Sequence, residues 1–300
     1  MNGDRLRLWI GFVIVSTVWG STWLAIKIGL ETVPPFLSVA ARFLVADLVL
    51  GGIILLRKER IPWTPNAWRV YLSMGVLTFT LPFALVYWGQ QFIPSALGSI
   101  LFATFPFCVA VVSRVMAPSE RLDRYTMLGI LFGFLGVLII FWGDIQVSDS
   151  RALWGMGAIL ASVVMQAVSL VQVKEWGHDV SPVVMNFVGM MMGLVALFVL
   201  GLFVEGAQPV TWTLPAVLSV LYLAVIGSVL AFVAYYWLLK RIEPVYLSLT
   251  SFINPIVALV LGSVVLKETL RASVFTGALL VLAGILVANW RNISTRLRRT

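Results

Sequence analysis

Long apolar stretches alternate with short polar segments along the whole chain. Each stretch holds roughly 20 residues, the length that an α-helix needs to cross a hydrocarbon core of about 30 Å. The breaks between stretches fall at charged residues, prolines and glycines. Ten spans are counted in this way: 8–30, 36–57, 68–89, 95–116, 123–142, 152–173, 182–204, 214–239, 245–266 and 272–291. The pattern predicts an all-α polytopic membrane protein with ten transmembrane helices.

The composition agrees with a chain whose main solvent is lipid. Hydrophobic residues make up 60% of the sequence and charged residues 11%, with a mean hydropathy of +1.00. A soluble domain carries roughly 25% charged residues and at most about 50% apolar ones. Most of this chain is therefore predicted to lie in the bilayer. Asn2 to Leu8 leads directly into the first span without a small-residue cleavage site, so no removed signal peptide is expected.

Basic residues gather on one side of the predicted membrane. The net charge is +8, but its clusters lie between apolar spans, so we expect no nucleic-acid partner. With the N-terminus in the cytoplasm, sixteen lysines and arginines fall on the inner side, and four fall on the outer side: Lys27, Arg151, Lys267 and Arg271. Because lysine and arginine favour the cytoplasmic ends of membrane helices, both termini are predicted to be cytoplasmic.

One sequence pattern occurs twice, half a chain apart, at offsets of 148 and 149 residues. The first copy consists of Tyr87-Trp88, Pro106, Glu120-x-Leu122, Gly129 and Gly136. The second copy consists of Tyr236-Trp237, Pro255, Glu268-x-Leu270, Gly277 and Gly284. Such a duplication divides the chain into two five-helix units, 8–142 and 152–291. The glycines are expected to allow close packing of helices.

An odd number of spans in each unit predicts that the second unit is inverted relative to the first. Inverted repeats of this kind are typical of transporters, which bind substrate near the midplane between the repeats and work by alternating access. An intramembrane enzyme would need a nucleophile with a base, paired acids or metal ligands. Cys108 is the only cysteine and His178 the only histidine, so no enzyme, metal site or cofactor is expected. A channel or an accessory subunit remains a less favoured alternative.

The first and second spans resemble a known family. Trp19-Gly20-Ser21-Thr22-Trp23-Leu24-Ala25-Ile26-Lys27, then Pro35 and Ala41-Arg42-Phe43, is similar to the opening of an EamA domain of the drug/metabolite transporter superfamily. The two Glu-x-Leu segments resemble the closing of such domains, so the resemblance covers nearly the whole chain. The first helix of the second unit, Leu153 to Val173, lacks the Trp-Gly signature and the lysine, which predicts an asymmetric role for the first helices.

Within this superfamily the chain is most similar to bacterial amino acid exporters of the YddG type, aromatic amino acids included. That resemblance implies a bacterial inner-membrane exporter of amino acids and related small metabolites, with broad specificity and no cofactor. An exporter of another small metabolite or drug is the alternative. The expected partners are the amino-acid substrate and the lipid bilayer, and a monomer is among the arrangements left open.

Polar and aromatic residues at mid-span depth are candidates for the substrate pathway, because a polar group in hydrocarbon needs a compensating role. Serine and threonine hydroxyls can instead bond to carbonyls of their own helix. Trp19 and Trp23 lie four residues apart, on one helix face, where they form either an aromatic wall for substrate or a packing surface. The candidates for substrate binding are Trp19, Thr22, Trp23, Arg42, Thr78, Tyr87, Ser99, Gln166, Asn186, Tyr235, Ser251 and Asn254.

Two charged residues lie inside the second span. Arg42 can attract a substrate carboxylate, and Asp47, nearer the centre of the span, is a candidate proton carrier. Five residues separate them, which puts their side chains about 140° apart around the helix. We therefore do not expect Arg42 and Asp47 to pair with each other.

Two prolines are candidate hinges. Pro106 and Pro255 lie close to the middle of their spans and occupy the same place in the two units. Proline interrupts the hydrogen bonds of a helix and frees the carbonyl four residues earlier, here those of Phe102 and Ser251. A static kink is the alternative interpretation. Pro82 has the same effect on Thr78 in the third span, without a counterpart in the second unit.

Overall fold

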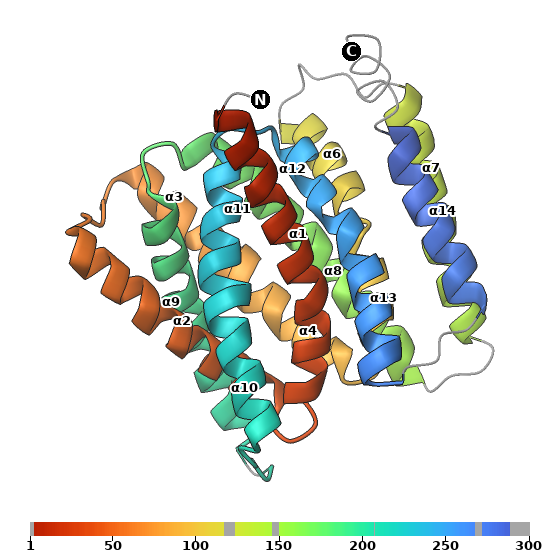
Figure 1. Ribbon diagram of the computed structural model, residues 1–300, viewed down its shortest axis with the longest axis horizontal. Coiled ribbons are helices and arrows are strands. Elements are labelled where there is room, and N and C mark those ends of the chain that lie inside the picture. Colours follow the sequence, from red (N-terminus) through yellow and green to blue (C-terminus); the bar gives the residue numbers. More distant parts are fainter. Residues whose placement is uncertain (1–2, 117–123, 146–149, 207, 268–271, 289–300) are drawn as a thin grey trace.

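The computed structural model describes residues 3–116, 124–145, 150–206, 208–267 and 272–288, which form a bundle of helices (Figure 1). The first unit contains α1 (Gly3–Gly29), α2 (Pro35–Arg57), α3 (Pro65–Met74), η1 (Gly75–Thr80), α4 (Leu81–Gln90), α5 (Ser95–Phe102), α6 (Phe105–Met116) and α7 (Arg124–Ile145). The second unit contains α8 (Ser150–Trp176), α9 (Pro182–Val204), α10 (Leu214–Tyr222), η2 (Leu223–Leu230), α11 (Ala231–Leu239), α12 (Pro244–Ser248), η3 (Leu249–Phe252), α13 (Ile253–Val265) and α14 (Ala272–Ala288).

The prediction of an all-helical polytopic membrane protein with about ten helices is confirmed. Within the described ranges, seven helices are long and apolar enough to cross a membrane, and three shorter apolar helices lie at Met127–Ile139, Ile253–Val265 and Ala272–Gly284. The segments α3, η1 and α4 run on as one span, Pro65–Gln90, and α10, η2 and α11 as another, Leu214–Leu239. The repeated acidic segments at Glu120 and Glu268 lie outside the described residues.

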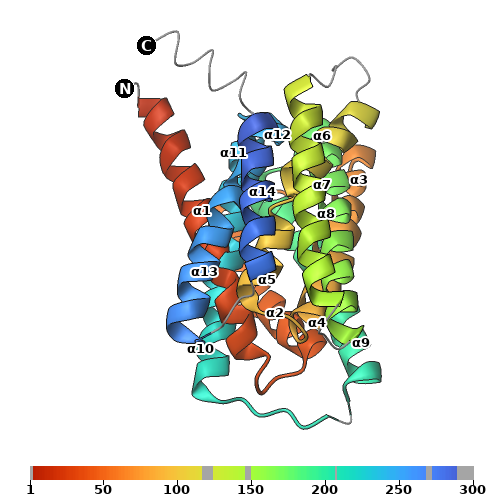
Figure 2. The ribbon, with the colours of Figure 1, turned by 90° about the vertical axis from the view of Figure 1, so that its right-hand side faces the viewer.

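The two units run in opposite directions. The α3 helix begins at one end of the bundle and α10, its counterpart, begins at the other end (Figures 1 and 2). The α1 helix begins and α14 ends at the same end of the bundle. This arrangement is the one that the odd number of spans in each unit requires.

The repeated glycines pack the last helices of the two units against each other at one edge of the bundle (Figure 1). A Cβ atom added at Gly136 would lie 2.5 Å from the carbonyl oxygen of Gly277, and one added at Gly284 would lie 2.6 Å from that of Gly129. Gly284 is the counterpart of Gly136, and Gly129 is the counterpart of Gly277, so each unit makes the same contact to the other unit. Reciprocity of this kind is what a pseudo-two-fold axis between α7 and α14 produces.

Both units contain a π-helical segment at the same place, which sequence analysis did not predict. The η1 segment begins at Gly75 and η2 begins at Leu223, 148 residues later. Pro82 follows η1, but no proline follows η2 within the helix that continues it. Proline is therefore not the shared cause of the two π segments, whose wider turns occur mostly as local bulges in α-helices.

The fourth helix of each unit is broken directly before its proline. In the first unit α5 ends at Phe102 and α6 begins at Phe105, so Pro106 is the second residue of α6. In the second unit the 3-10 segment η3 separates α12 from α13, and Pro255 is the third residue of α13. Proline is well tolerated in the first turn of a helix because that turn needs no backbone N–H donors. The breaks match the predicted interruptions, and their role as hinges stays a prediction.

A lysine at the end of the first helix of each unit caps the end of the third helix. Lys27 Nζ donates to the carbonyl oxygens of Gln90 (2.9 Å) and Ile93 (3.0 Å). Lys174 Nζ donates in the same way to those of Leu239 (2.8 Å) and Ile242 (3.2 Å). The prediction that the second unit lacks the lysine was wrong. The α8 helix continues to Trp176, three residues past its expected end, and so includes the equivalent residue.

The N-terminus of α2 is capped by a residue from the other unit. Glu205, directly after α9, accepts hydrogen bonds from the backbone N–H groups of Phe36 (2.8 Å) and Leu37 (2.9 Å). These N–H groups have no partner within their own helix, and a carboxylate also complements the positive end of the helix dipole. Burial raises the pKa of Glu205, and the two hydrogen bonds from the α2 backbone oppose that shift. This contact fixes the start of α2, the helix that carries Arg42.

Candidate functional site

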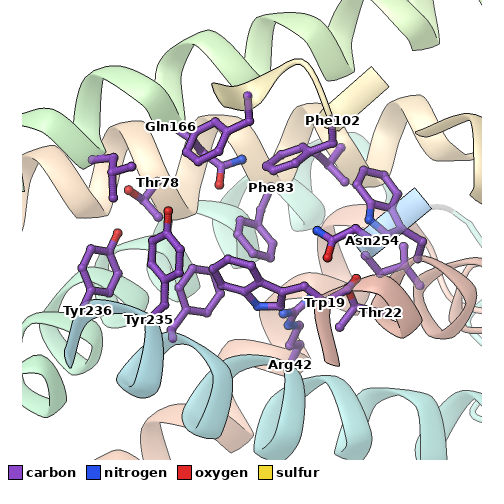
Figure 3. Close-up of a pocket in the computed structure, with 16 residues that line it drawn as sticks. Trp19, Thr22, Arg42, Thr78, Phe83, Phe102, Gln166, Tyr235, Tyr236 and Asn254 are labelled. Atoms are coloured by element: carbon purple, nitrogen blue, oxygen red, sulfur yellow. The ribbon is translucent and has the colours of Figure 1, made fainter. Parts of the chain in front are cut away.

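A cavity lies between the two units, and residues of both units line it (Figure 3). Its volume is about 90 Å³, counted as space open to the centres of water molecules. About 10–15 Å³ of such space holds one water, so several fit. The lining comes from α1, α2, η1, α4, α5 and α6 of the first unit and from α8, α11 and α13 of the second. The position between the units agrees with the place expected for a substrate site in an inverted repeat.

Eight of the twelve predicted substrate-binding residues line this cavity. They are Trp19, Thr22, Trp23, Arg42, Thr78, Gln166, Tyr235 and Asn254. They come from six segments of the chain, so their convergence is a product of tertiary packing.

The other four predicted residues are buried outside the cavity lining. The Tyr87 hydroxyl accepts a hydrogen bond from Arg42 Nη1 at 3.3 Å, so Tyr87 supports a lining residue from behind. Asn186 donates to the carbonyl oxygen of Pro182 in its own helix, and Ser251 donates to that of Ser248. The Ser99 hydroxyl is buried, and no described residue forms a hydrogen bond with it. Ser251 thus bonds to a backbone carbonyl of its own span, which was the alternative to a pathway role for serine and threonine hydroxyls. The Asn186 amide makes the same kind of bond within α9.

Aromatic rings form most of the cavity wall, and sequence analysis missed most of them. The Trp19 ring lies 5.0 Å from the Phe232 ring and 4.7 Å from the Tyr235 ring, measured between centroids. The lining rings that were not predicted are Phe83, Phe102, Phe105, Phe232 and Tyr236. Phenylalanine is common throughout this chain, so its positions alone carry little information. The place of Phe105 directly before Pro106, and of Tyr236 in the repeated Tyr-Trp pair, were the available signals.

Trp19 and Trp23 both line the cavity and pack against neighbouring helices. The indole N–H of Trp19 donates to the carbonyl oxygen of Gly227 at 3.3 Å, which anchors the ring to η2. Trp23 packs edge-on against Phe102 at 5.8 Å and fits over Gly98, where an added Cβ atom would lie 2.7 Å from its ring. The two expected roles are therefore compatible, because a ring held by one helix still presents a face to the cavity.

Arg42 brings a positive charge to the cavity. Its side chain is 3% exposed, and its Nε donates to the Ser228 hydroxyl at 2.8 Å. The guanidinium group lies over the Phe83 ring, 4.9 Å from the centroid (Figure 3). No carboxylate among the described residues forms an ion pair with it. A buried charge held only by neutral groups costs free energy that a bound anion would recover.

Asp47 is buried away from the cavity lining. Its side chain is 3% exposed, and neither carboxylate oxygen has a hydrogen-bond partner among the residues that the structure describes. It forms no ion pair with Arg42, as the spacing predicted. A carboxyl group without partners can change its protonation without breaking a contact. The role of Asp47 as a proton carrier remains a prediction.

A chain of hydroxyl groups leads away from the cavity at Thr78. Thr78 donates to Ser169 at 2.7 Å, Ser169 and Ser73 lie 3.0 Å apart, and Ser73 donates to Gln172 at 2.8 Å. These bonds join η1 and α3 of the first unit to α8 of the second. Thr22, in contrast, donates to the carbonyl oxygen of Trp19 in its own helix. Thr78 is thus held across the boundary between the units, whereas Thr22 is held within one helix.

Comparison with known proteins relates the sequence to transporters. The family model described as the EamA-like transporter family matches residues 7–142 and 153–290. The uncharacterised transporter YoaV of Bacillus subtilis is 28% identical over 280 residues, which cover 93% of this chain and 96% of that protein. The uncharacterised inner membrane transporter YedA of Escherichia coli K12 is 26% identical, covering 84% and 81%. A crystal structure that is 21% identical aligns over 98% of this chain and 99% of its own, with a TM-score of 0.70, which shows a shared fold.

Proposed function

Because the chain belongs to the EamA-like transporter family, we propose that it exports amino acids and related small metabolites, aromatic ones included, by alternating access between its two units. The family is one of transporters, so the chain is a multi-pass membrane transporter and not an enzyme. Its substrate is a small molecule, and lipid surrounds it. The proposal concerns the substrate, the direction of transport and the mechanism.

The observation that carries the proposal is the pairing of Arg42 with an aromatic wall. An amino acid offers a carboxylate, which a guanidinium group binds through two parallel hydrogen bonds when its geometry allows. The rings of Trp19, Phe83 and Phe232 offer faces and edges to an apolar or aromatic side chain. Most of the wall consists of aromatic rings, which make few directional polar contacts. Such a wall favours binding of several different substrate side chains and not of a single one.

Alternating access is supported by the way the helices around the cavity are interrupted. The breaks before Pro106 and Pro255 and the π segments η1 and η2 occur at matched places in the two units. Interrupted helices lack part of the backbone hydrogen bonding that keeps a continuous helix straight. We propose that the bundle rocks about these breaks, so that the cavity faces one side of the membrane and then the other.

The proposed location is the bacterial inner membrane, with both termini in the cytoplasm. The name of the Escherichia coli relative gives that membrane for that protein. For this chain, the bias of lysine and arginine toward one side supports the orientation.

The proposal is tested by counterflow in liposomes that contain the purified protein. The liposomes are loaded with an unlabelled amino acid, and entry of labelled phenylalanine is followed with and without a pH gradient. We expect saturable exchange that phenylalanine, tryptophan and leucine all support. Entry that does not saturate would indicate a channel instead. If no amino acid supports exchange, the proposed substrate class is wrong.

A further inference from the structure

We propose that the cavity between the units recognises the carboxylate of its ligand and not an ammonium group, so that its substrates include aromatic monocarboxylates without an amino group. This inference rests on the proposed function, because it concerns the ligand of the same cavity. It goes beyond that function by naming the charge that the ligand must carry.

The cavity carries one positive charge and no negative one. Arg42 is the only Lys, Arg, Asp, Glu or His side chain among the described residues that line it. Asp47, on the same helix, lies outside the lining and has no partner for either oxygen, so no contact links it to the guanidinium. The charge of Arg42 is therefore left for the ligand to neutralise.

The fixed neighbours of Arg42 are neutral. A guanidinium group has five N–H donors, and Arg42 donates to two hydroxyl groups among the described residues, Ser228 from Nε and Tyr87 from Nη1. The face of the group lies over Phe83. These contacts hold the plane of the guanidinium in one orientation and leave further donors for an anion. A preorganised donor group of this kind binds a carboxylate with little loss of side-chain freedom.

The other polar residues that line the cavity are neutral. Tyr235 lines the cavity (Figure 3), and its hydroxyl group is buried without a hydrogen-bond partner among the described residues. In the orientation that satisfies its neighbours, the Asn254 amide nitrogen donates to the carbonyl oxygens of Ser16 (2.8 Å) and Thr250 (3.2 Å), so both of its N–H groups are used within the protein. A ligand ammonium would find neutral oxygens and ring faces in this lining, and the described lining residues offer it no carboxylate. Neutral acceptors bind a cation more weakly than a carboxylate does.

Net charge then sets an order of preference. A monocarboxylate makes the occupied cavity neutral, a zwitterionic amino acid leaves one positive charge, and an amine leaves two. Like charges repel strongly in surroundings of low dielectric constant, where water does not screen them. Cation–π contacts with the rings offset part of this repulsion for an ammonium, but Arg42 already occupies the Phe83 face. The order expected is therefore carboxylate first, amino acid second or equal, and amine last.

Three probes with the same phenylethyl skeleton separate these charges: 3-phenylpropionate, L-phenylalanine and phenethylamine. Each is titrated into the purified full-length protein at neutral pH, and its apparent Kd is obtained from the rise in melting temperature. We expect 3-phenylpropionate to bind at least as tightly as phenylalanine, and phenethylamine to bind at least about tenfold more weakly than 3-phenylpropionate. A phenethylamine affinity within tenfold of that of 3-phenylpropionate overturns the inference, as does weaker binding of 3-phenylpropionate than of phenylalanine.

Variants of Arg42 assign the preference to its charge. Arg42→Gln should weaken 3-phenylpropionate binding by about tenfold or more and remove most of its advantage over phenethylamine. Arg241→Gln is the matched control, because Arg241 is exposed and lies over Trp237 outside the cavity lining. Its affinities should equal those of the unsubstituted protein. If the Arg42→Gln protein folds and still binds 3-phenylpropionate much more tightly than phenethylamine, the inference is overturned. If this variant does not fold, the order of the three affinities in the unsubstituted protein decides.

The outcomes separate this inference from the proposed function. Binding of 3-phenylpropionate by a protein that exchanges no amino acid would remove the proposed amino-acid transport and leave the charge preference standing. Exchange of phenylalanine by a protein that does not bind 3-phenylpropionate would remove the charge preference and leave the proposed amino-acid transport standing. If none of the three probes binds, both proposals are wrong.

Discussion

At the scale of single residues, α2 buries two ionisable side chains, one in the cavity lining and one outside it. Arg42 and Asp47 are ionisable and buried, and Trp19 presents a ring to an open space while its N–H is bound to η2. Buried charges and unpaired polar groups are costly in a membrane protein and usually mark functional sites. Two predictions follow from their surroundings, one for the ring and one for the carboxyl group.

Trp19→Ala should reduce transport of aromatic substrates more than transport of small ones. The substitution removes a ring that would contact an aromatic substrate, and such ring pairs contribute about 0.5–1.5 kcal/mol beyond area burial. We expect a fall of roughly tenfold in phenylalanine exchange and a smaller fall for threonine, measured by counterflow. Trp154→Ala is the control, since Trp154 is 71% exposed in the bundle and lies outside the lining. Equal losses for phenylalanine and threonine would contradict the aromatic wall.

Asp47→Asn should uncouple transport from a pH gradient and leave exchange in place. The amide keeps the shape of the carboxyl group but cannot take up and release a proton. Uphill accumulation of substrate driven by an imposed pH gradient should be lost, while counterflow without a gradient stays within about twofold of the unsubstituted rate. Asp179→Asn, at an exposed loop position, serves as the control. Uphill accumulation that survives in Asp47→Asn would rule out the carboxyl group as the proton carrier.

At the scale of elements, the helices divide into tightly packed pairs and interrupted spans. The α7 and α14 helices meet through glycines, with no room for side chains between them. The spans that contain η1, η2 and the breaks before the two prolines surround the cavity. Close packing resists movement, whereas an interrupted helix can bend. The two kinds of element therefore call for different tests, one of stability and one of rate.

Gly136→Ala should lower the melting temperature of the protein. The added Cβ atom would lie 2.5 Å from the Gly277 carbonyl oxygen, and overpacking of this kind costs about 1–3 kcal/mol. Gly157→Ala is the matched control in α8, because no atom lies within 4 Å of its added Cβ. There alanine should stabilise the helix by roughly 0.5–1 kcal/mol. Equal melting temperatures for the two variants, measured in the same detergent, would show that α7 and α14 accommodate the added Cβ atom without loss of stability.

Pro106→Ala and Pro255→Ala should slow exchange more than they weaken substrate binding. Alanine restores a backbone N–H and favours a continuous helix across the break. The measurement compares the rate of counterflow with the apparent Kd of the same substrate. Pro182→Ala, at the first residue of α9 and outside the cavity lining, is the control. If Pro106→Ala and Pro255→Ala both exchange substrate at the rate of the unsubstituted protein, the breaks are static kinks and not hinges.

At the scale of the whole molecule, the inverted arrangement puts equivalent contacts at opposite ends of the bundle. The lysine caps at Lys27 and Lys174 are an example, because the first helix of each unit ends on a different side. Contacts related in this way can alternate between a closed and an open state on the two sides of a membrane. Which end of the bundle faces the cytoplasm decides which of these contacts lies on the inner side of the membrane.

The orientation is tested with single cysteines introduced into a Cys108→Ser background. In the proposed topology Gln208, between α9 and α10, faces outward, and Lys58, after α2, faces the cytoplasm; both are exposed. A membrane-impermeant thiol reagent should label Gln208→Cys in intact cells and label Lys58→Cys only after permeabilisation. The reverse pattern would place the termini outside and overturn the proposed orientation.

The sequence by itself determined that this protein lies in lipid, how many helices cross the membrane, and that its two units are inverted. Runs of about 20 apolar residues leave a helix in lipid as the available structure, because backbone polar groups must be satisfied within each segment. The offset between the two copies and the odd number of spans then required inversion. The glycines at 129, 136, 277 and 284 were expected to pack helices together, and they pair α7 with α14.

The tertiary structure alone decided which residues meet. Asn186 and Ser251 looked like pathway residues by depth, but their side chains donate to backbone carbonyls four and three residues earlier in the chain. Phe102 and Phe232 line the cavity without any signal in their spacing. The π segments and the Glu205 cap on α2 also escaped sequence analysis. The physical reason is that hydropathy gives the depth of a residue in the membrane, whereas its direction depends on the rotation and packing of each helix against the others. Arg42 was a candidate from its depth, and only the packed bundle showed that its charge has no fixed counter-ion within the described part of the chain.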